Sequence, residues 1–257
     1  MTGHDHAVAP PALPLRPFVS HYAGSRMCDV PQGEHAGLPS QYIDLIVSLA
    51  KPIEIARMPG ARSPGTYHAF VAGLQQAPAL VRMGGHLDCL HVFLKPGAAR
   101  ALLGVSGREL TSRVVHLADI SGAMCNELTE RLGGAHTWPQ RCAAVDRVLL
   151  RTLRPVTLPD AMAWAWRGLA ITHGHVPVHQ LARDIGFSRR HFGERFLAEF
   201  GIVPKAAARV VRFEHACRLL MRAPRRIADV AVASGFHDQA VQRAVQRAHL
   251  RRGAGVG

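Results

Sequence analysis

The sequence contains no apolar run long enough to cross a membrane, since a bilayer-spanning helix needs ~18–20 such residues. Residues 1–15 also lack the charged region followed by an apolar region that marks a secretory signal peptide. The hydrophobic fraction of 48% is enough to form a folded core and excludes a disordered chain. These features predict a cytoplasmic protein without a membrane partner.

Cysteine is scarce, and the motifs of several enzyme classes are absent. The five cysteines are odd in number and form no C-x-x-C pair, which favours reduced thiols over disulfides or a zinc knuckle. The chain has no glycine-rich phosphate loop, no G-x-S-x-G nucleophile elbow and no paired-carboxylate motif. We therefore expect no enzyme activity, no catalytic residue and no cofactor.

One short segment, HLDCLH, contains four side chains that could bind a metal. Side chains alternate along a strand, so His86 and Asp88 would face one way while Cys89 and His91 face the other. Only two ligands could then converge, and a site would need a third from elsewhere in the chain. A metal-dependent barrel enzyme with a helical appendage is therefore a minor alternative, and no metal site is expected.

Lysine is also rare, with three residues against 28 arginines, and the positive charge is unevenly distributed. Residues 164–257 hold 16 basic and 6 acidic side chains, whereas residues 1–163 hold 15 and 12, for a net charge of +13. A GC-rich genome would explain arginine in place of lysine but not this asymmetry. The basic last third is typical of a module that binds a polyanion such as nucleic acid.

The pattern of apolar residues divides the chain into two parts. Residues 18–100 contain short apolar or alternating runs separated by Gly and Pro, which predict the strands of a barrel or sandwich. Helical spacing follows, and TLRPVTLPD at 152–160 predicts a linker. We expect an α+β protein in which residues 1–155 form a small β-barrel-like domain with helices. Residues 156–257 form an all-α domain.

Asp44 is an isolated acid in an apolar stretch, YIDLIV, within the strand-rich part. Its apolar neighbours make it the most unusual of the isolated acids in this sequence. We expect Asp44 to pair with an arginine or to line a pocket rather than to act in catalysis.

A phrase in the basic part of the chain occurs twice, 49 residues apart. VHQLARDIGFS begins at Val178, and IADVAVASGFH begins at Ile227. Both contain an alanine, whose small side chain lets two helices approach, and a glycine, which can end a helix in the left-handed conformation. This spacing predicts a helix-turn-helix, with Ser188 as the cap of the second helix in the first copy.

The helix after Ser188 is expected to have two distinct faces. Phe192, Phe196 and Phe200 recur every four residues, which predicts one buried stripe. At ~100° per residue, the polar and charged side chains point away from that stripe. One face would anchor the helix, and the other would be free to enter a DNA major groove. The side chains on this outward face are Arg190, His191, Glu194 and Arg195.

These features resemble the DNA-binding region of the AraC family of bacterial transcription regulators. The resemblance covers roughly the last third of the chain, and its long ordered pattern is far more specific than a single helix-turn-helix. The matching residues are Leu181, Ala182, Gly186, Phe187, Ser188, Phe192, Phe196, Gly201, Pro204, Arg212, Phe213, Ala216, Leu219, Leu220, Ile227, Val230, Ala231, Gly235, Phe236, Asp238 and Gln239.

The resemblance implies two helix-turn-helix subdomains joined by a long helix over about 204–221. Each would place one recognition helix in successive major grooves of double-stranded DNA. Carried over position by position, the base readers would be Arg190, Gly193 and Glu194 in the first unit and Gln239, Ala240 and Arg243 in the second. The remaining members of the expected DNA-binding set are Ser188, Arg189, His191 and Arg195.

The sequence departs from the family's pattern at several places, and one of them is Ala207, where the family has an aromatic residue in the linker helix. Gly193 has no side chain with which to read a base, and Gln242 and Gln246 replace aromatic residues. The family's closing helix is missing at the end, which we interpret as a truncated or frameshifted reading frame. The alternative function is a sensor or decoy protein whose incomplete second unit impairs DNA binding and which acts through dimerisation alone.

The N-terminal part resembles a sensor domain found ahead of such DNA-binding regions, over about residues 14–122. The segments that carry the resemblance are FVSHY, LPSQYIDLIVSL, FVAGL and FLKPGAARALLGVSGREL. This resemblance implies a small barrel that binds a small-molecule effector or mediates homodimerisation. Together the two parts predict an effector-responsive regulator that binds specific DNA sequences.

Overall fold

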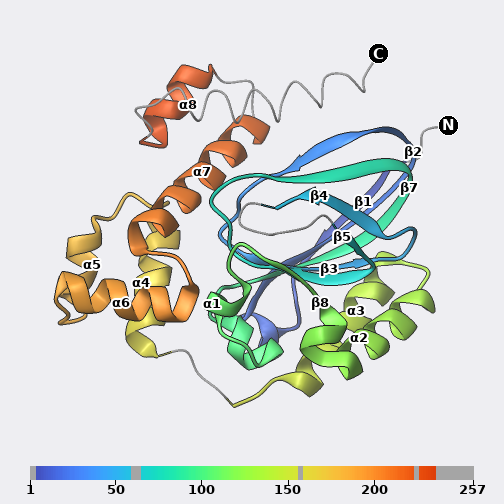
Figure 1. Ribbon diagram of the computed structural model, residues 1–257, viewed down its shortest axis with the longest axis horizontal. Helices are drawn as coiled ribbons and strands as arrows, with labels where there is room; N and C mark the ends of the chain where they lie inside the picture. The colour runs from blue at the N-terminus through green and yellow to red at the C-terminus, as the bar shows by residue number, and fades with distance from the viewer. Residues whose placement is uncertain (1–3, 59–64, 156–158, 223–225, 236–257) are drawn as a thin grey trace.

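The computed structural model describes residues 4–58, 65–155, 159–222 and 226–235. Two helices pack against a large sheet, and a further group of helices lies at one end of the molecule (Figure 1). The α+β class predicted from the sequence is confirmed. In the described part of the chain, no helix is both long and apolar enough to cross a membrane.

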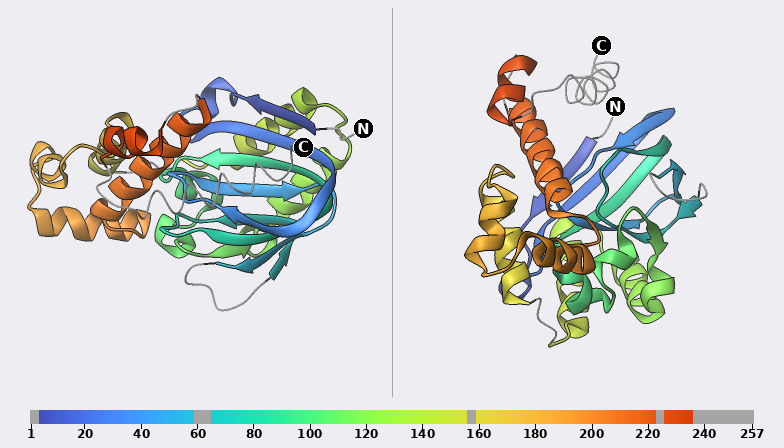
Figure 2. Two further views of the ribbon diagram at one scale, coloured as in Figure 1. Left: turned by 90° about the horizontal axis from the view of Figure 1, so that it is seen from above. Right: turned by 60° about the vertical axis from the view of Figure 1, so that its left-hand side comes forward.

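The strands of the described residues form one antiparallel sheet in the order β1-β2-β7-β3-β6-β8, and β4 pairs with both β5 and β7. The long strand β7 pairs with β3 through its second half and with β4 through its first half, and the sheet bends along its length (Figure 2). The path β1 to β8 is open, so the sheet is not a closed barrel and the expected barrel-like form is not confirmed. The strands are β1 (His4–Ala9), β2 (Val19–Gly37), β3 (Ile43–Ser48), β4 (Ile53–Arg57), β5 (Gly65–Tyr67), β6 (Ala69–Ala72), β7 (Ala79–Leu94) and β8 (Val114–His116).

The two faces of the sheet differ in burial because side chains alternate along each strand. Tyr22, Leu45 and Leu94 point to one face and are fully buried. Helices α2 (Leu117–Gly133) and α3 (Trp138–Thr152) pack beside the sheet and bury their apolar faces in the same cluster (Figure 1). On the opposite face, Ile46 and Phe70 belong to a second, smaller buried cluster, whereas His21 and Phe93 keep partial exposure.

The remaining helices lie before, between and after these elements. They are η1 (Leu13–Leu15), the π-helix η2 (Ala99–Leu103), α1 (Gly107–Leu110), α4 (Asp160–Ile171), α5 (Val178–Asp184), α6 (Arg189–Phe200), α7 (Pro204–Arg222) and α8 (Ile227–Ala233). Helices α4 to α8 form the group at one end of the molecule, so the helical character predicted for the C-terminal part is confirmed for residues 159–222 and 226–235.

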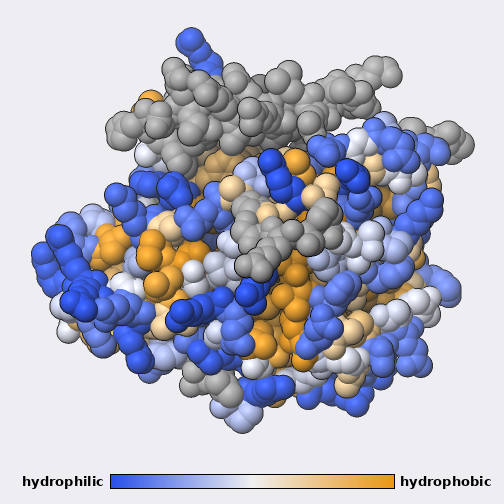
Figure 3. Space-filling view, in the orientation of Figure 1, coloured by the Kyte–Doolittle hydropathy of each residue, from blue (hydrophilic) through white to orange (hydrophobic). Residues whose placement is uncertain are grey.

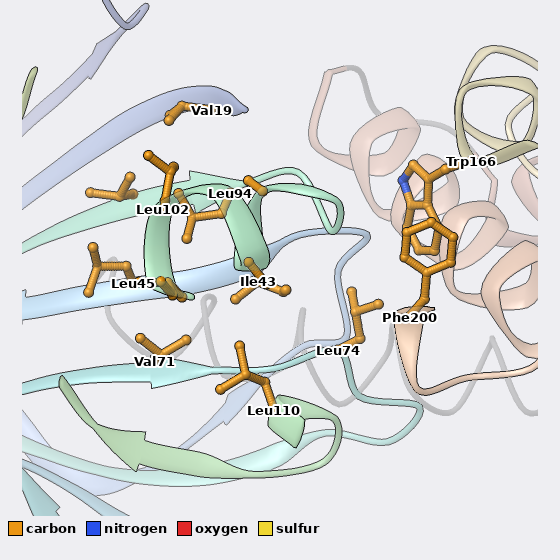
Figure 4. Packing of buried hydrophobic residues seen from close by; sticks show 14 of the residues in the cluster. Val19, Ile43, Leu45, Val71, Leu74, Leu94, Leu102, Leu110, Trp166 and Phe200 are labelled. Atoms are coloured by element: carbon orange, nitrogen blue, oxygen red, sulfur yellow. The ribbon is translucent and has the colours of Figure 1, made fainter. Parts of the chain in front are cut away.

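One buried cluster extends from the sheet into this helical group. Figure 4 shows Leu74 and Leu110 on the sheet side opposite Phe200 and Trp166 on the helical side. The division predicted between residues 155 and 156 therefore separates two parts that share apolar packing. The linker itself includes residues 156–158, which lie outside the described part of the chain, so the boundary stays a prediction.

Asp88, one of the candidate metal ligands, is bound by two arginines. Its carboxylate accepts hydrogen bonds from Arg141 Nη1 at 2.7 Å and Nη2 at 3.1 Å, and from Arg26 Nε at 3.0 Å. Burial by itself would raise the pKa of Asp88, but the hydrogen bonds from Arg141 and Arg26 outweigh it and hold this pKa below its usual value. Among the described residues, no three His, Cys, Asp or Glu side chains are grouped as a metal site requires.

Replacing Arg141 with alanine should lower the free energy of unfolding by about 3–5 kcal/mol, because it leaves a buried carboxylate without its main partner. The Arg141 guanidinium also lies 4.7 Å from the centre of the Trp138 ring, a contact that the substitution removes. Arg82→Ala is the matched control, since Arg82 and Glu54 form an exposed pair whose loss should cost at most about 1 kcal/mol. Urea denaturation at pH 7 measures both values, and equal losses would contradict this role for Arg141.

Candidate nucleic-acid interface

The first repeat of the sequence forms a helix-turn-helix from α5 and α6. Gly186 ends the first helix with φ of 71°, a conformation that side-chain-bearing residues rarely adopt. The Ser188 hydroxyl oxygen then accepts a hydrogen bond from the backbone N–H of His191 at 3.2 Å, which caps α6. The turn and the cap expected from the sequence are both confirmed.

The phenylalanine stripe of α6 is completely buried. Phe192, Phe196 and Phe200 each have 0% exposed surface. The Phe196 and Phe200 ring centres are 4.6 Å apart, and Phe200 lies 4.7 Å from Trp166 of α4 (Figure 4). The orientation of α6 is therefore set by its apolar side, as predicted.

The opposite side of α6 is exposed and carries the first group of predicted DNA-binding residues. Arg190 is 90% exposed, and its Nε donates to Glu194 Oε1 at 2.9 Å one turn along the helix. The ring of His191 packs edge-on against Phe187, with centres 4.6 Å apart. Figure 3 shows hydrophilic side chains gathered at the end of the molecule that α5 and α6 form. The residues placed on this exposed surface are Ser188, Arg189, Arg190, His191, Glu194 and Arg195.

Gly193 lies between these side chains and leaves space beside the helix. A Cβ atom built at this position would meet nothing within 4 Å. The first recognition helix therefore has a gap at one of its three predicted base-reading positions.

The second repeat is described only as far as its turn. Helix α8 buries Val230 against Ala216 of α7, and Gly235 follows with φ of 64°. The first helix and the turn glycine of the second unit are thus as expected. The predicted readers Gln239, Ala240 and Arg243 lie outside the described residues.

Helix α6 makes a contact with the sheet-containing part that was not expected from the sequence. Arg100 Nε donates to Glu199 Oε1 at 2.9 Å, and the Thr111 hydroxyl donates to the Phe200 carbonyl oxygen at 3.0 Å. A Cβ atom on Gly107 would lie 2.8 Å from the Glu199 carbonyl oxygen, so this close approach requires glycine. The partners lie about 90 residues or more apart in sequence, and no local pattern indicates them.

Helix α7 also contacts the sheet-containing part. The backbone N–H of Gln41 donates to Glu214 Oε2 at 2.8 Å, and Arg209 Nη2 donates to Gln76 Oε1 at 2.8 Å. The helix that joins the two repeats is thereby held at the end of the sheet where β3 begins.

A family model described as a helix-turn-helix domain, of the AraC type, matches residues 181–252. Residues 181–252 therefore form a helix-turn-helix domain of the AraC type. A second model, described as a domain of unknown function (DUF6597), matches residues 7–116, so most of the sheet falls within it. No curated protein matches the chain.

The solved structures that are similar to this chain include ToxT and CuxR. An apo ToxT variant from Vibrio cholerae has a TM-score of 0.52 at 10% identity, covering 87% of this chain and 92% of that one. Another crystal form of ToxT has a TM-score of 0.49 at 9% identity, covering 95% and 94%. The AraC-like transcriptional activator CuxR has a TM-score of 0.32 at 16% identity, covering 79% and 77%. At these identities only the fold is comparable, and the first of the three carries that comparison.

Phe196→Ala should destabilise the protein by about 3–5 kcal/mol, because it opens a cavity at the centre of the buried stripe. Leu197→Ala is the control on the same helix, since Leu197 is 38% exposed and its loss should cost far less. Thermal and urea unfolding measure both variants. A Phe196→Ala protein as stable as the parent would contradict the orientation of α6 and of every side chain assigned to its outward face.

Proposed function

We propose that this protein is a transcription regulator that binds specific sequences of double-stranded DNA and responds to a small-molecule effector. Residues 156–257 form its DNA-binding domain, and residues 1–155 form a sensor or dimerisation domain. The observation that carries the proposal is the exposed basic face of α6, held outward by three fully buried phenylalanines.

DNA binding combines two kinds of contact. Arginines of the basic C-terminal part neutralise backbone phosphates, a contribution that weakens as salt concentration rises. Side chains of α6 that reach the base edges supply the sequence preference. Arg190 is well suited to guanine because its planar guanidinium can donate two parallel hydrogen bonds to O6 and N7. In the free protein Glu194 holds this guanidinium, so DNA would compete with an exposed ion pair worth ~1 kcal/mol or less.

Effector response is supported by the contacts between the sheet-containing part and the helices. The end of α6 is bonded to Arg100 and Thr111, and α7 is bonded to the start of β3. A ligand that shifts the sheet edge would therefore change the position of both helices relative to DNA. Homodimerisation through residues 1–155 is part of the same proposal, and light scattering of the purified protein measures it.

Arg190→Ala should weaken binding to the preferred operator by about 1–3 kcal/mol and relax the preference at one base pair. The operator would first be obtained by selection from a random DNA pool with the full-length protein. Arg167→Ala removes an exposed charge from α4, which is not part of the predicted DNA-binding set, and should leave the base preference unchanged. Equal losses on operator and random DNA would assign Arg190 to a phosphate and refute its role as a base reader.

The second repeat is expected to contribute less to DNA binding than the first. Gln242 and Gln246 occupy positions where the family has aromatic anchors, each of which typically stabilises a core by about 3–5 kcal/mol. We expect a footprint limited to one major-groove segment and a salt slope reduced by ~0.9 per lost phosphate contact. Protection of two successive major grooves would show that the second unit binds fully. Absence of any preferred sequence would favour the sensor or decoy alternative.

A further inference from the structure

A group of aromatic side chains lies on the partly exposed face of the sheet, at the end near α7. The register pairs His21 of β2 with Phe93 of β7, and Phe93 with Asp44 of β3. Directly paired residues of adjacent strands point to the same face, and Tyr42 lies two residues before Asp44. We call this surface the aromatic face. It consists of the rings of His21, Tyr42 and Phe93 together with the carboxyl group of Asp44, and each of these side chains is partly accessible to solvent.

The rings of the aromatic face contact one another closely. His21 stacks on Phe93 with ring centres 4.2 Å apart and planes 9° apart. Tyr42 meets both rings edge-on with ring centres 5.9 Å apart, and the ring centre of His91 lies 5.9 Å from that of Phe93. A ring face that is not covered by another ring attracts cations, because it is electron-rich.

Asp44 lies beside these rings with a carboxyl oxygen that has no partner. Its Oδ1 is buried and makes no hydrogen bond, and no described arginine or lysine forms an ion pair with it. Burial raises the pKa of Asp44 to about 7, and the neighbouring carboxylate of Glu214 contributes in the same direction. Of the two outcomes expected from the sequence, pairing with an arginine is therefore not seen. A buried acceptor without a donor is costly, and a ligand N–H would satisfy it.

The ionisable groups around Asp44 favour a positively charged ligand. Glu214 of α7 is a second carboxylate, whereas the positive charge of Arg218, one turn further along α7, acts to lower the pKa of Tyr42. Burial lowers the pKa of His21. Burial, and to a smaller extent the charge of His6, lowers the pKa of His91 to about 4, so both rings are neutral near pH 7. Burial also raises the pKa of Tyr42, which keeps its hydroxyl protonated.

We propose that the aromatic face binds a small protonated amine, with Asp44 accepting its N–H and Phe93, Tyr42 and His21 surrounding its positive charge. A protonated amine fits better than a quaternary ammonium ion because the free Asp44 oxygen requires a hydrogen-bond donor. A carboxylate ligand would instead meet Asp44 and Glu214, two groups of its own charge. The inference rests on the proposed function in one respect, that this amine is the effector.

The position of the aromatic face connects ligand binding to α7. Asp44 belongs to the sheet, and Glu214 belongs to the helix that joins the two repeats. Glu214 also accepts the backbone N–H of Gln41, three residues before Asp44. A cation between the two carboxylates would remove their mutual repulsion and draw α7 toward β3.

The test uses the full-length protein and three matched sets of probes: butylamine, hexylamine and phenethylamine, each with the alcohol and the carboxylate of the same skeleton. Isothermal titration calorimetry at pH 8 should show at least one amine bound with Kd on the order of 1 mM or tighter and at least tenfold more tightly than its alcohol. The carboxylates should bind more weakly still. An alcohol or carboxylate that binds as well as its amine, or no amine binding at all, overturns the proposal.

Two substitutions and one control locate the bound amine. Asp44→Asn keeps the size of the side chain but removes its charge, and should reduce amine affinity to that of the alcohol. Phe93→Leu keeps an apolar side chain without a ring, and should weaken the amine more than the alcohol. Glu54→Gln removes a carboxylate on β4 that is paired with Arg82, and should change neither affinity. Circular dichroism confirms that each variant is folded, and unchanged amine affinity in folded Asp44→Asn overturns the proposal.

The pH dependence separates a direct role of Asp44 from a structural one. With its pKa at about 7, Asp44 is mostly protonated at pH 6 and must release this proton to bind an amine. Amine affinity should therefore rise several-fold from pH 6 to pH 8, while alcohol affinity stays constant. A flat amine profile contradicts the proposal.

DNA binding is measured separately, so that the two proposals can fail independently. Amine selectivity without any DNA binding would refute the proposed function and leave the amine site intact. DNA binding without amine selectivity would refute the amine site alone.

Discussion

Burial of the phenylalanine stripe of α6 is the constraint on which the rest of the structure depends. A helix of this length is marginal by itself in water, so its stability comes from packing of its apolar face. Phe192, Phe196 and Phe200 are completely buried, and Phe200 packs against Trp166. This packing turns the charged side of α6 outward. The surface that we propose binds DNA is therefore exposed because the opposite side of the helix is buried.

The same stripe joins the two parts of the molecule. Its last member, Phe200, lies in a cluster that continues through Leu110 and Leu74 into the sheet (Figure 4). The hydrogen bond from Thr111 to the Phe200 carbonyl and the ion pair from Arg100 to Glu199 hold the end of the recognition helix there. Because tightly packed groups cannot move independently, displacement of the sheet edge would be transmitted to α6.

A second connection runs through α7, and it differs in character from the first. The seam at α6 is apolar and close-packed, whereas the contact between α7 and β3 is polar and includes an unpaired carboxyl oxygen on Asp44. Close-packed apolar side chains resist displacement. A buried polar group without a partner is stabilised when a ligand supplies the missing hydrogen bond. This contrast makes the α7 contact the better suited of the two to respond to a ligand.

The local elements were predictable from the sequence because neighbouring residues determine them. The glycine turn, the Ser188 cap and the spacing of the phenylalanines define the first helix-turn-helix, and alternating apolar residues define the strands. The sequence predicts the individual strands but not that they form an open sheet, because strand order depends on pairings between distant segments. The contacts of Glu199, Phe200 and Glu214 depend on residues about 90 to 170 positions away, which leave no periodic signal. Likewise, the sequence marks Asp44 as an unusual acid, but only the tertiary structure places His21 and Phe93 beside it, because cross-strand register decides which side chains meet.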